Sequence, residues 1–286
     1  MVKIHQAMKI VIFLLFLGGS LSLAQRGVFN SAYKGNINLQ LGTASTYFQA
    51  STLNFSGSKF DFLVQNATLR QPHSELVLPS SEWAENQYKL TVGYTVKRGI
   101  LLSLNIDNFK YSLTPQELLI SGRVAPGYDQ LGGLSGIYNN TNVSMDTLGF
   151  AFNVSSAKFI STRLEFLQNL YRVKNRMFVI NAAYGIGIGV LHSASNMVFG
   201  PAEQSKITGF SGLGVNVNVG LRFEFFRHFY MMPLLNGGYL FQRNLRIDIS
   251  DATQHVRHNV GFGQVSINIG TVFFLGKKEN CDCPHF

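Results

Sequence analysis

The sequence has little charge, only two cysteines and few long apolar runs. Charged residues make up 14% of the chain, well below the quarter that is usual for globular domains. After residue 24 no apolar run reaches the ~20 residues that a membrane-spanning helix needs, which excludes a bundle of such helices. The two cysteines, Cys281 and Cys283, are two positions apart, and a disulfide between them would be strained. The sequence contains no glycine-rich phosphate loop and no nucleic-acid-binding module.

A strict alternation of large apolar residues with polar or small residues runs from 212 to 226. The odd positions carry the apolar side chains: Leu213, Val215, Val217, Val219, Leu221, Phe223 and Phe225. A β-strand with one face in hydrocarbon and the other in a polar interior has this period of two. Ordinary strands have about 5–6 residues, whereas a tilted membrane-spanning strand needs about 9–11. The run therefore predicts an all-β fold, a transmembrane antiparallel β-barrel.

The same alternation recurs along the chain, most clearly at 88–97 and 180–190. Three short connections and four long ones separate the predicted strands: 97–99, 172–176 and 227–228, and near 70–86, 113–146, 193–209 and 248–256. Barrels of the bacterial outer membrane have short periplasmic turns and long outer loops, and counting back from the last strand places these connections accordingly. The count is twelve strands if 51–69 forms a hairpin and 115–124 a strand, and ten if 113–146 is one loop.

The first 24 residues have the features of a secretory signal. Lys3 and Lys9 supply the charged start, 10–17 the apolar centre, and Ser22 to Ala24 the small residues that precede a cleavage site. The chain then divides into a cleaved signal peptide at 1–24, a barrel domain at 25–276 and a periplasmic C-terminal tail at 277–286. The formal net charge of +9 matches lipopolysaccharide phosphates as counter-charge, or is a diffuse excess without a role; no nucleic-acid partner is expected.

The last predicted strand resembles the β-signal of outer-membrane proteins, which reads polar, any, Gly, two of any kind, hydrophobic, any, hydrophobic. Asn268, Gly270, Phe273 and Leu275 occupy the matching positions. The resemblance implies the barrel-assembly machinery as a partner. The departure from the pattern is the tail after Leu275, because many members of the group end on an aromatic residue in that strand.

The whole chain from residue 25 also resembles a family of small predicted outer-membrane β-barrel proteins of Gram-negative bacteria. The resemblance rests on Leu41-Gly42, Phe60-Asp61-Phe62, Val92-Gly93-Tyr94, the stretch from Gly220 to Phe226, and Gly237-Gly238-Tyr239. It implies localisation in the bacterial outer membrane, in contact with outer-membrane lipid and lipopolysaccharide. Members of that family have no assigned activity, so the resemblance implies no specific function and no cofactor.

Four charged residues share the polar faces of two predicted strands. Arg163 and Glu165 lie on one strand, and Arg222 and Glu224 lie on another, with Asn181 on the strand between them. Charges in a barrel wall must face inward, where they pair or line water. We expect a lumen-facing charged belt, and two interpretations stay open. Either each Arg pairs with its own Glu and stabilises the barrel, or the belt acts as a gate or filter.

Two further groups of residues have side chains that could form a chemical site. The segment from His192 to Asn196 loosely resembles the His-x-Ser-Asn motif of outer-membrane lipid A deacylases, but its spacing is one residue longer. On a strand, that spacing puts His192 and Ser195 on opposite faces, so we expect no catalytic residues. Cys281, Cys283 and His285 supply at most three ligands on a chain terminus, so we expect no metal site. His255 and His258 are interpreted as residues in or beside a surface loop.

The sequence favours a non-enzymatic surface or structural protein, whose outer loops contact ligands or partners and whose barrel holds them. The first alternative is a narrow channel or transporter for ions or small apolar compounds. The second is a barrel enzyme that acts on lipid A. The ligand, the oligomeric state and the openness of the lumen are not predicted.

Overall fold

The computed structural model describes residues 34–72, 87–126, 135–145, 150–173, 177–199, 207–226, 228–246 and 253–274. The predicted signal peptide and the predicted C-terminal tail lie outside these residues, as does Leu275. The described chain is almost entirely β-strand, and no helix in it is long and apolar enough to cross a membrane.

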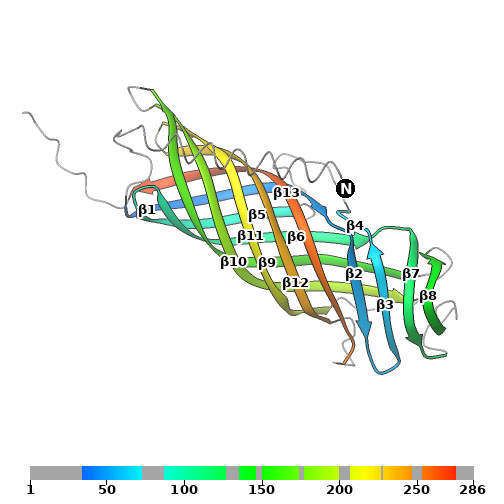
Figure 1. Ribbon diagram of the computed structural model, residues 1–286. Helices are drawn as coiled ribbons and strands as arrows, with labels where there is room; N and C mark the ends of the chain where they lie inside the picture. Colours follow the sequence, from blue (N-terminus) through cyan, green and yellow to red (C-terminus); the bar gives the residue numbers. More distant parts are fainter. Residues whose placement is uncertain are drawn as a thin grey trace, which may run out of the picture.

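Thirteen strands form one antiparallel sheet (Figure 1). Their bounds are β1 Asn36–Phe48, β2 Ser51–Ser56, β3 Phe60–Ala67, β4 Leu69–Arg70, β5 Gln87–Lys97, β6 Ile100–Leu113, β7 Glu117–Val124, β8 Gly136–Ser144, β9 Phe150–Arg172, β10 Phe178–Phe199, β11 Ile207–Phe225, β12 Phe229–Arg246 and β13 His255–Phe274.

Eight of these strands close into a ring in the order β1-β5-β6-β9-β10-β11-β12-β13. The ring closes because β1 pairs over its whole length with β13, from Asn36 opposite Phe274 to Phe48 opposite Phe262. The strand ends at Lys97 and Ile100, at Arg172 and Phe178, and at Phe225 and Phe229 lie at one end of the ring, which we name the turn end. The opposite end is the loop end. The predicted fold class is confirmed, and the strands end beside all three predicted short turns, of which residues 174–176 and 227 lie outside the described residues.

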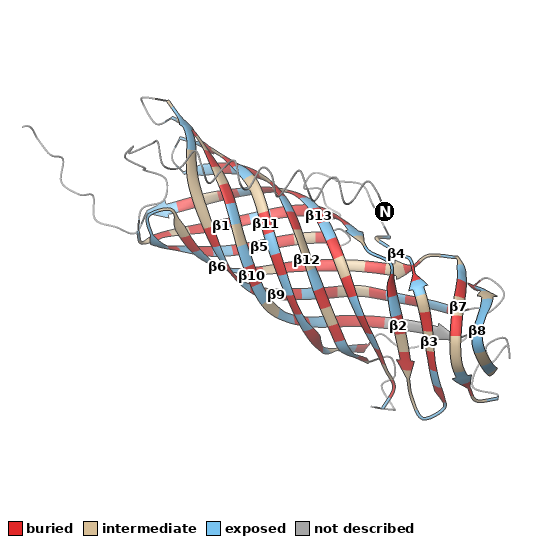
Figure 2. Ribbon diagram, in the orientation of Figure 1, coloured by how far each residue is buried: buried red, intermediate tan, exposed pale blue. Residues whose placement is uncertain are grey.

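In the half of the barrel nearer the turn end, which we call the lower barrel, the outer face of the ring is apolar and the inner face is polar. On β11 the predicted apolar residues face outward, with Val217 59% exposed, whereas Asn216, Asn218 and Arg222 between them are buried. Figure 2 shows the same alternation of buried and exposed residues along the ring strands. Every backbone group of a closed barrel finds a partner within the sheet, and the exposed apolar side chains then require a lipid environment. We name these outward-facing residues the apolar belt.

The strands β2, β3, β7 and β8 continue the sheet beyond the loop end of the ring and form what we name the outer sheet (Figure 1). It begins where β13 exchanges its partner, since β13 pairs with β1 at Phe262 and with β2 from His258 to His255. From there β2 pairs with β3, β3 with β7, and β7 with β8.

The strand count of ten or twelve is corrected by this arrangement, because the closed ring of described residues has eight strands. The segments 51–69 and 115–124 are strands, as predicted, but they pair above the ring and do not enter it. The range 113–146 is not one loop, since it holds β7 and β8. The interpretation of His255 and His258 as loop residues is wrong as well, because both belong to β13 and pair with β2.

Candidate functional site

Six charged side chains are buried inside the ring, and they balance in sign. The cations are Lys89, Arg163 and Arg222, and the anions are Asp107, Glu165 and Glu224; each is at most 4% exposed. Among the described residues no other Lys, Arg, Asp or Glu is buried. Burying an unpaired charge costs several kcal/mol, so three cations and three anions in one lumen require close pairing.

The middle of the lumen holds a chain of four charges. Lys89 Nζ lies 3.1 Å from Asp107 Oδ1, and Arg163 Nη2 lies 3.5 Å from Asp107 Oδ2. Arg163 Nη1 in turn lies 3.1 Å from Glu165 Oε1. Three strands contribute these residues, because β5 carries Lys89, β6 carries Asp107 and β9 carries the last two. The ion pairs therefore connect three neighbouring strands of the ring on its inner face.

A second ion pair lies nearer the turn end. Arg222 Nε lies 2.8 Å from Glu224 Oε1, and Arg222 Nη2 donates to Asn38 Oδ1 across the barrel at 3.0 Å. The guanidinium carbon of Arg222 lies 3.8 Å from the ring centroid of Tyr230, which is cation–π distance. Asn181 Nδ2 donates to Glu224 Oε1 at 3.0 Å. Arg222 thus links strands on opposite sides of the lumen.

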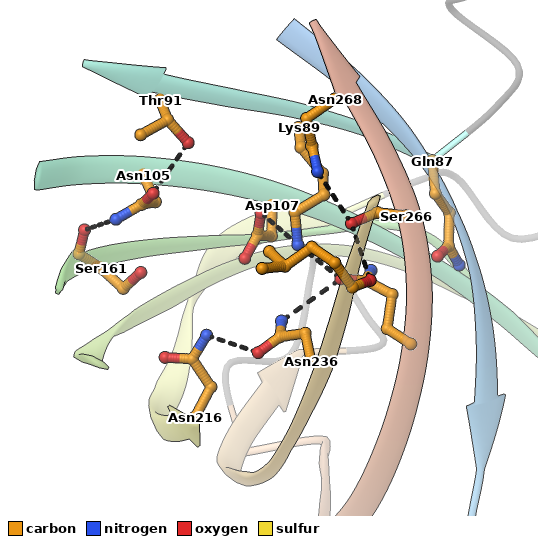
Figure 3. A network of polar contacts seen from close by, with 12 residues as sticks. Gln87, Lys89, Thr91, Asn105, Asp107, Ser161, Asn216, Asn236, Ser266 and Asn268 are labelled. Atoms are coloured by element: carbon orange, nitrogen blue, oxygen red, sulfur yellow. Dashed lines mark hydrogen bonds and ion pairs between the residues drawn. The ribbon is translucent and has the colours of Figure 1, made fainter. Parts of the chain in front are cut away.

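Amide and hydroxyl side chains connect the charges to the other walls (Figure 3). Lys89 Nζ donates to Gln264 Oε1 at 2.5 Å, and Asn236 Nδ2 donates to the same oxygen at 3.3 Å. Asn216 Nδ2 donates to Asn236 Oδ1 at 3.0 Å. Gln264 Nε2 donates to Thr46 Oγ1 at 3.1 Å. The network therefore reaches from β5 across the lumen to β11, β12, β13 and β1, and its side chains occupy the cross-section.

An apolar cluster fills the barrel above this polar network. Phe109, Phe159 and Leu240 are fully buried and belong to one cluster with the inner face of the outer sheet. The ring centroids of Phe109 and Phe262 lie 4.8 Å apart. On the outer sheet, Phe55 stacks on Phe62 at 4.7 Å. In the lower barrel polar side chains point inward, whereas in this upper part the inward-pointing side chains are apolar.

One polar triangle interrupts the apolar cluster. Tyr111 Oη donates to Gln242 Oε1 at 2.9 Å and lies 2.9 Å from His258 Nε2. His258 Nε2 also lies 2.9 Å from Gln242 Oε1. The flanking Arg257 and Asn259 are exposed and polar, so this level lies outside the hydrocarbon. Burial lowers the pKa of His258 to about 4, so its imidazole is neutral at pH 7.

The predicted belt residues Arg163, Glu165, Arg222 and Glu224 all lie in the lumen, and each Arg pairs with the Glu two positions later. Sequence reasoning missed Lys89 and Asp107 as partners. Counting outward from the tight turn at 98–99 would put Lys89 opposite Asn108. The register shift between Thr95 and Lys97 moves the pairing by one residue and puts Lys89 opposite Asp107.

The β-signal residues occupy different environments within β13. Asn268 is buried, and its Nδ2 donates to the Met232 carbonyl at 2.9 Å. A Cβ at Gly270 would lie 2.2 Å from the ring of Tyr230, so this position needs glycine. Phe273 faces outward in the apolar belt. The structure does not test their recognition by an assembly machinery.

The segment that loosely resembles a deacylase motif has the geometry expected from its spacing. His192 is exposed, whereas Ser193 and Ser195 are buried. Ser195 Oγ donates to the Arg246 carbonyl at 2.6 Å, and Ser193 Oγ lies 2.7 Å from Ser211 Oγ. A nucleophile needs its base within hydrogen-bond reach, and these hydroxyls have other partners. In the described part of the chain no group of three His, Cys, Asp or Glu could hold a metal ion.

No protein-family model and no curated protein matches the chain. Solved structures similar to it include the outer membrane protein OprG from Pseudomonas aeruginosa, at 8% identity and a TM-score of 0.38 over 86% of this chain and 99% of that one. The N-terminal β-barrel domain of Pseudomonas aeruginosa OprF has 9% identity and a TM-score of 0.37 over 84% and 98%. Ail, the attachment invasion locus protein of Yersinia pestis, has 11% identity and a TM-score of 0.35 over 84% and 99%.

These similarities are low, and the assignment of the fold rests on the strand pairing itself. A closed antiparallel ring of even strand number, with an apolar outer belt and a polar interior, is the architecture of bacterial outer-membrane barrels. The fold of this protein is that of an outer-membrane β-barrel. In barrels of that architecture the short turns lie on the periplasmic side and the longer loops on the outer side.

Proposed function

We propose that this protein is a non-enzymatic surface protein, in which a sealed barrel anchors the outer sheet and its loops for contact with ligands or partners outside the cell. The observation that carries the proposal is the filling of the lumen. The ion pairs and amides occupy its middle, and the apolar cluster around Phe109 and Phe159 covers them from the loop end.

The charge balance of the lumen supports an anchor over a channel. A selectivity filter for ions presents a ring of one charge sign, whereas the six buried charges here sum to zero. Opening a path through them would break the pairs between Lys89, Asp107 and Arg163. Breaking a buried ion pair costs about 3–5 kcal/mol, which makes spontaneous opening rare.

The outer sheet supplies the surface that the anchor displays. Strand β8 is largely exposed, with Ile137 89% exposed and the polar run from Asn139 to Asn142 beside it. Among the described strands β8 pairs with β7, so its second edge forms the end of the described sheet. Such an edge can pair with an added strand, and loops on a rigid scaffold are common binding elements.

Thiol labelling tests both parts of the proposal. In a background with Cys281 and Cys283 replaced by serine, single cysteines are introduced at Asn139, at Lys97 beside the short turn, and at Ser266, which is fully buried in the lumen. A small membrane-impermeant maleimide is then added to intact cells and to cells with a permeabilised outer membrane.

We expect Asn139→Cys to react on intact cells and Lys97→Cys to react only after permeabilisation. Ser266→Cys should react in neither case until the protein is unfolded. If Ser266→Cys reacted as fast as Asn139→Cys, the lumen would be open and the channel alternative would replace the proposal. If Asn139→Cys reacted only after permeabilisation, the display of the outer sheet would be refuted.

A further inference from the structure

A pocket of about 770 Å³ opens in the barrel wall at β13, where the strand loses regular pairing on both sides. On one side Gln49 and Ala50 separate β1 from β2, and Gln49 N donates to the Gly261 carbonyl at 2.8 Å. On the other side the register of β12 against β13 shifts between Gln242 and Leu245. These two irregularities separate the strands locally and create the hollow.

The pocket lies at the upper edge of the apolar belt. Below it on β13, Val265 and Ile269 face outward in the belt. Tyr239 lines the pocket and is 39% exposed. Aromatic residues with a polar tip favour the level where hydrocarbon meets head groups. The outward-facing residues above it are the polar Asn259 and Arg257. A molecule in the pocket would therefore contact head groups of the outer leaflet.

Two arginines give the pocket a positive charge. Arg243 and Arg257 line it and are exposed. Its other lining residues include no carboxylate, and within the described ranges neither arginine forms an ion pair. Guanidinium groups bind phosphate through paired N–H donors. Two of them beside one hollow form a cationic site that still needs an anionic partner.

Three buried polar atoms of the same wall also lack partners. They are Ser51 Oγ, Gln242 Nε2 and His258 Nδ1, and their residues are at most 6% exposed. A buried polar group without a hydrogen bond is costly, and polar atoms of a ligand in the pocket could supply the missing partners. The amide and the hydroxyl are donors and would complement the oxygens of a phosphate.

We propose that this pocket binds a phosphate group of a phosphorylated glycolipid in the outer leaflet. Arg243 and Arg257 bind the phosphate, Ser51 and Gln242 donate to its oxygens or to the sugar, and the acyl chains lie along the apolar belt below Tyr239. The same chemistry would bind free inorganic phosphate, but the position at the edge of the belt favours the lipid. The two arginines of this site face outward and take no part in the ion pairs of the lumen, so either proposal can fail alone.

The test is a titration of the refolded full-length protein with bisphosphorylated lipid A in a neutral detergent. The charge-removing variant is R243Q/R257Q. The matched control is R70Q/R123Q, which removes two other exposed arginines of the outer region that do not line the pocket. A third variant, R243K/R257K, keeps the charge and removes the forked geometry. Folding of each variant is checked by its gel mobility before boiling.

We expect R243Q/R257Q to bind lipid A about tenfold more weakly, as the loss of charge-assisted hydrogen bonds predicts. The control should bind as the wild type, and R243K/R257K should lie between the two. Dephosphorylated lipid A should bind the wild type as weakly as lipid A binds R243Q/R257Q. Equal weakening in the control would overturn the site. Inorganic phosphate binding as tightly as lipid A would overturn the assignment to a glycolipid.

Discussion

The substitution Asp107→Asn tests the lumen network most sharply, because Asp107 holds two cations. Its carboxylate lies 3.1 Å from Lys89 Nζ and 3.5 Å from Arg163 Nη2, and all three side chains are at most 1% exposed. The variant leaves Arg163 with Glu165 but leaves Lys89 with Gln264 alone. Removing one partner of a buried pair costs about 3–5 kcal/mol, because the other charge stays buried and uncompensated.

The second substitution Lys89→Met removes that uncompensated charge at nearly constant volume. We expect the double variant K89M/D107N to be more stable than D107N, with a coupling free energy of about 2 kcal/mol or more in a double-mutant cycle. The assay is urea unfolding of the barrel refolded in detergent, followed by the gel mobility of unboiled samples. The control Asp61→Asn removes an exposed carboxylate and should cost less than about 0.5 kcal/mol.

The reasoning is refuted by either of two results. A D107N variant within about 1 kcal/mol of the wild type would show that the lumen is hydrated enough to solvate Lys89. A double variant as unstable as the sum of the two single variants would show that the two residues do not interact.

Three further predictions follow from single contacts. Gly270→Ala should lower the yield of refolded barrel and destabilise it by about 1–3 kcal/mol, because the new methyl would collide with the Tyr230 ring; the added change Tyr230→Ala should restore part of the yield. Phe159→Ala should cost about 3–5 kcal/mol in urea unfolding, since Phe159 is fully buried, whereas the outward-facing Phe210→Ala should cost clearly less. Because the pKa of His258 is lowered to about 4, this residue adds no pH dependence to stability above pH 6.5 and lowers stability by about 3 kcal/mol between pH 6.5 and 4; the fall should be smaller in His258→Gln.

The ring and its inward polar face were predictable because one physical contrast, lipid outside and polar atoms inside, acts on every residue of β11. From Leu213 to Phe225, apolar residues alternate without interruption with polar or small residues. The same contrast predicted that Arg222 and Glu224 point inward. The partners of Lys89 depend on register, which alternation does not encode, and the register shift between Thr95 and Lys97 moves the pairing by one residue from the count that the turn at 98–99 gives.

The number of ring strands was not predictable from alternation. A period of two is the same whether the apolar face meets lipid or an apolar interior. Phe60 and Phe62 on β3 and Phe150 and Phe152 on β9 alternate as clearly as β11, but they point inward and join the apolar cluster. The pocket at β13 was also hidden, because it forms from a strand break at 49–50 and a register shift in β12, and neither has a marked residue pattern.

Single-channel conductance in a planar bilayer tests the sealed lumen most directly. The sample is the refolded protein whose gel mobility shifts on boiling, and a porin measured in the same bilayer is the positive control. The account predicts that the folded barrel gives no discrete current steps. Discrete steps whose ion selectivity changes in Arg222→Glu would contradict it and would establish a conducting pore lined by the charged belt.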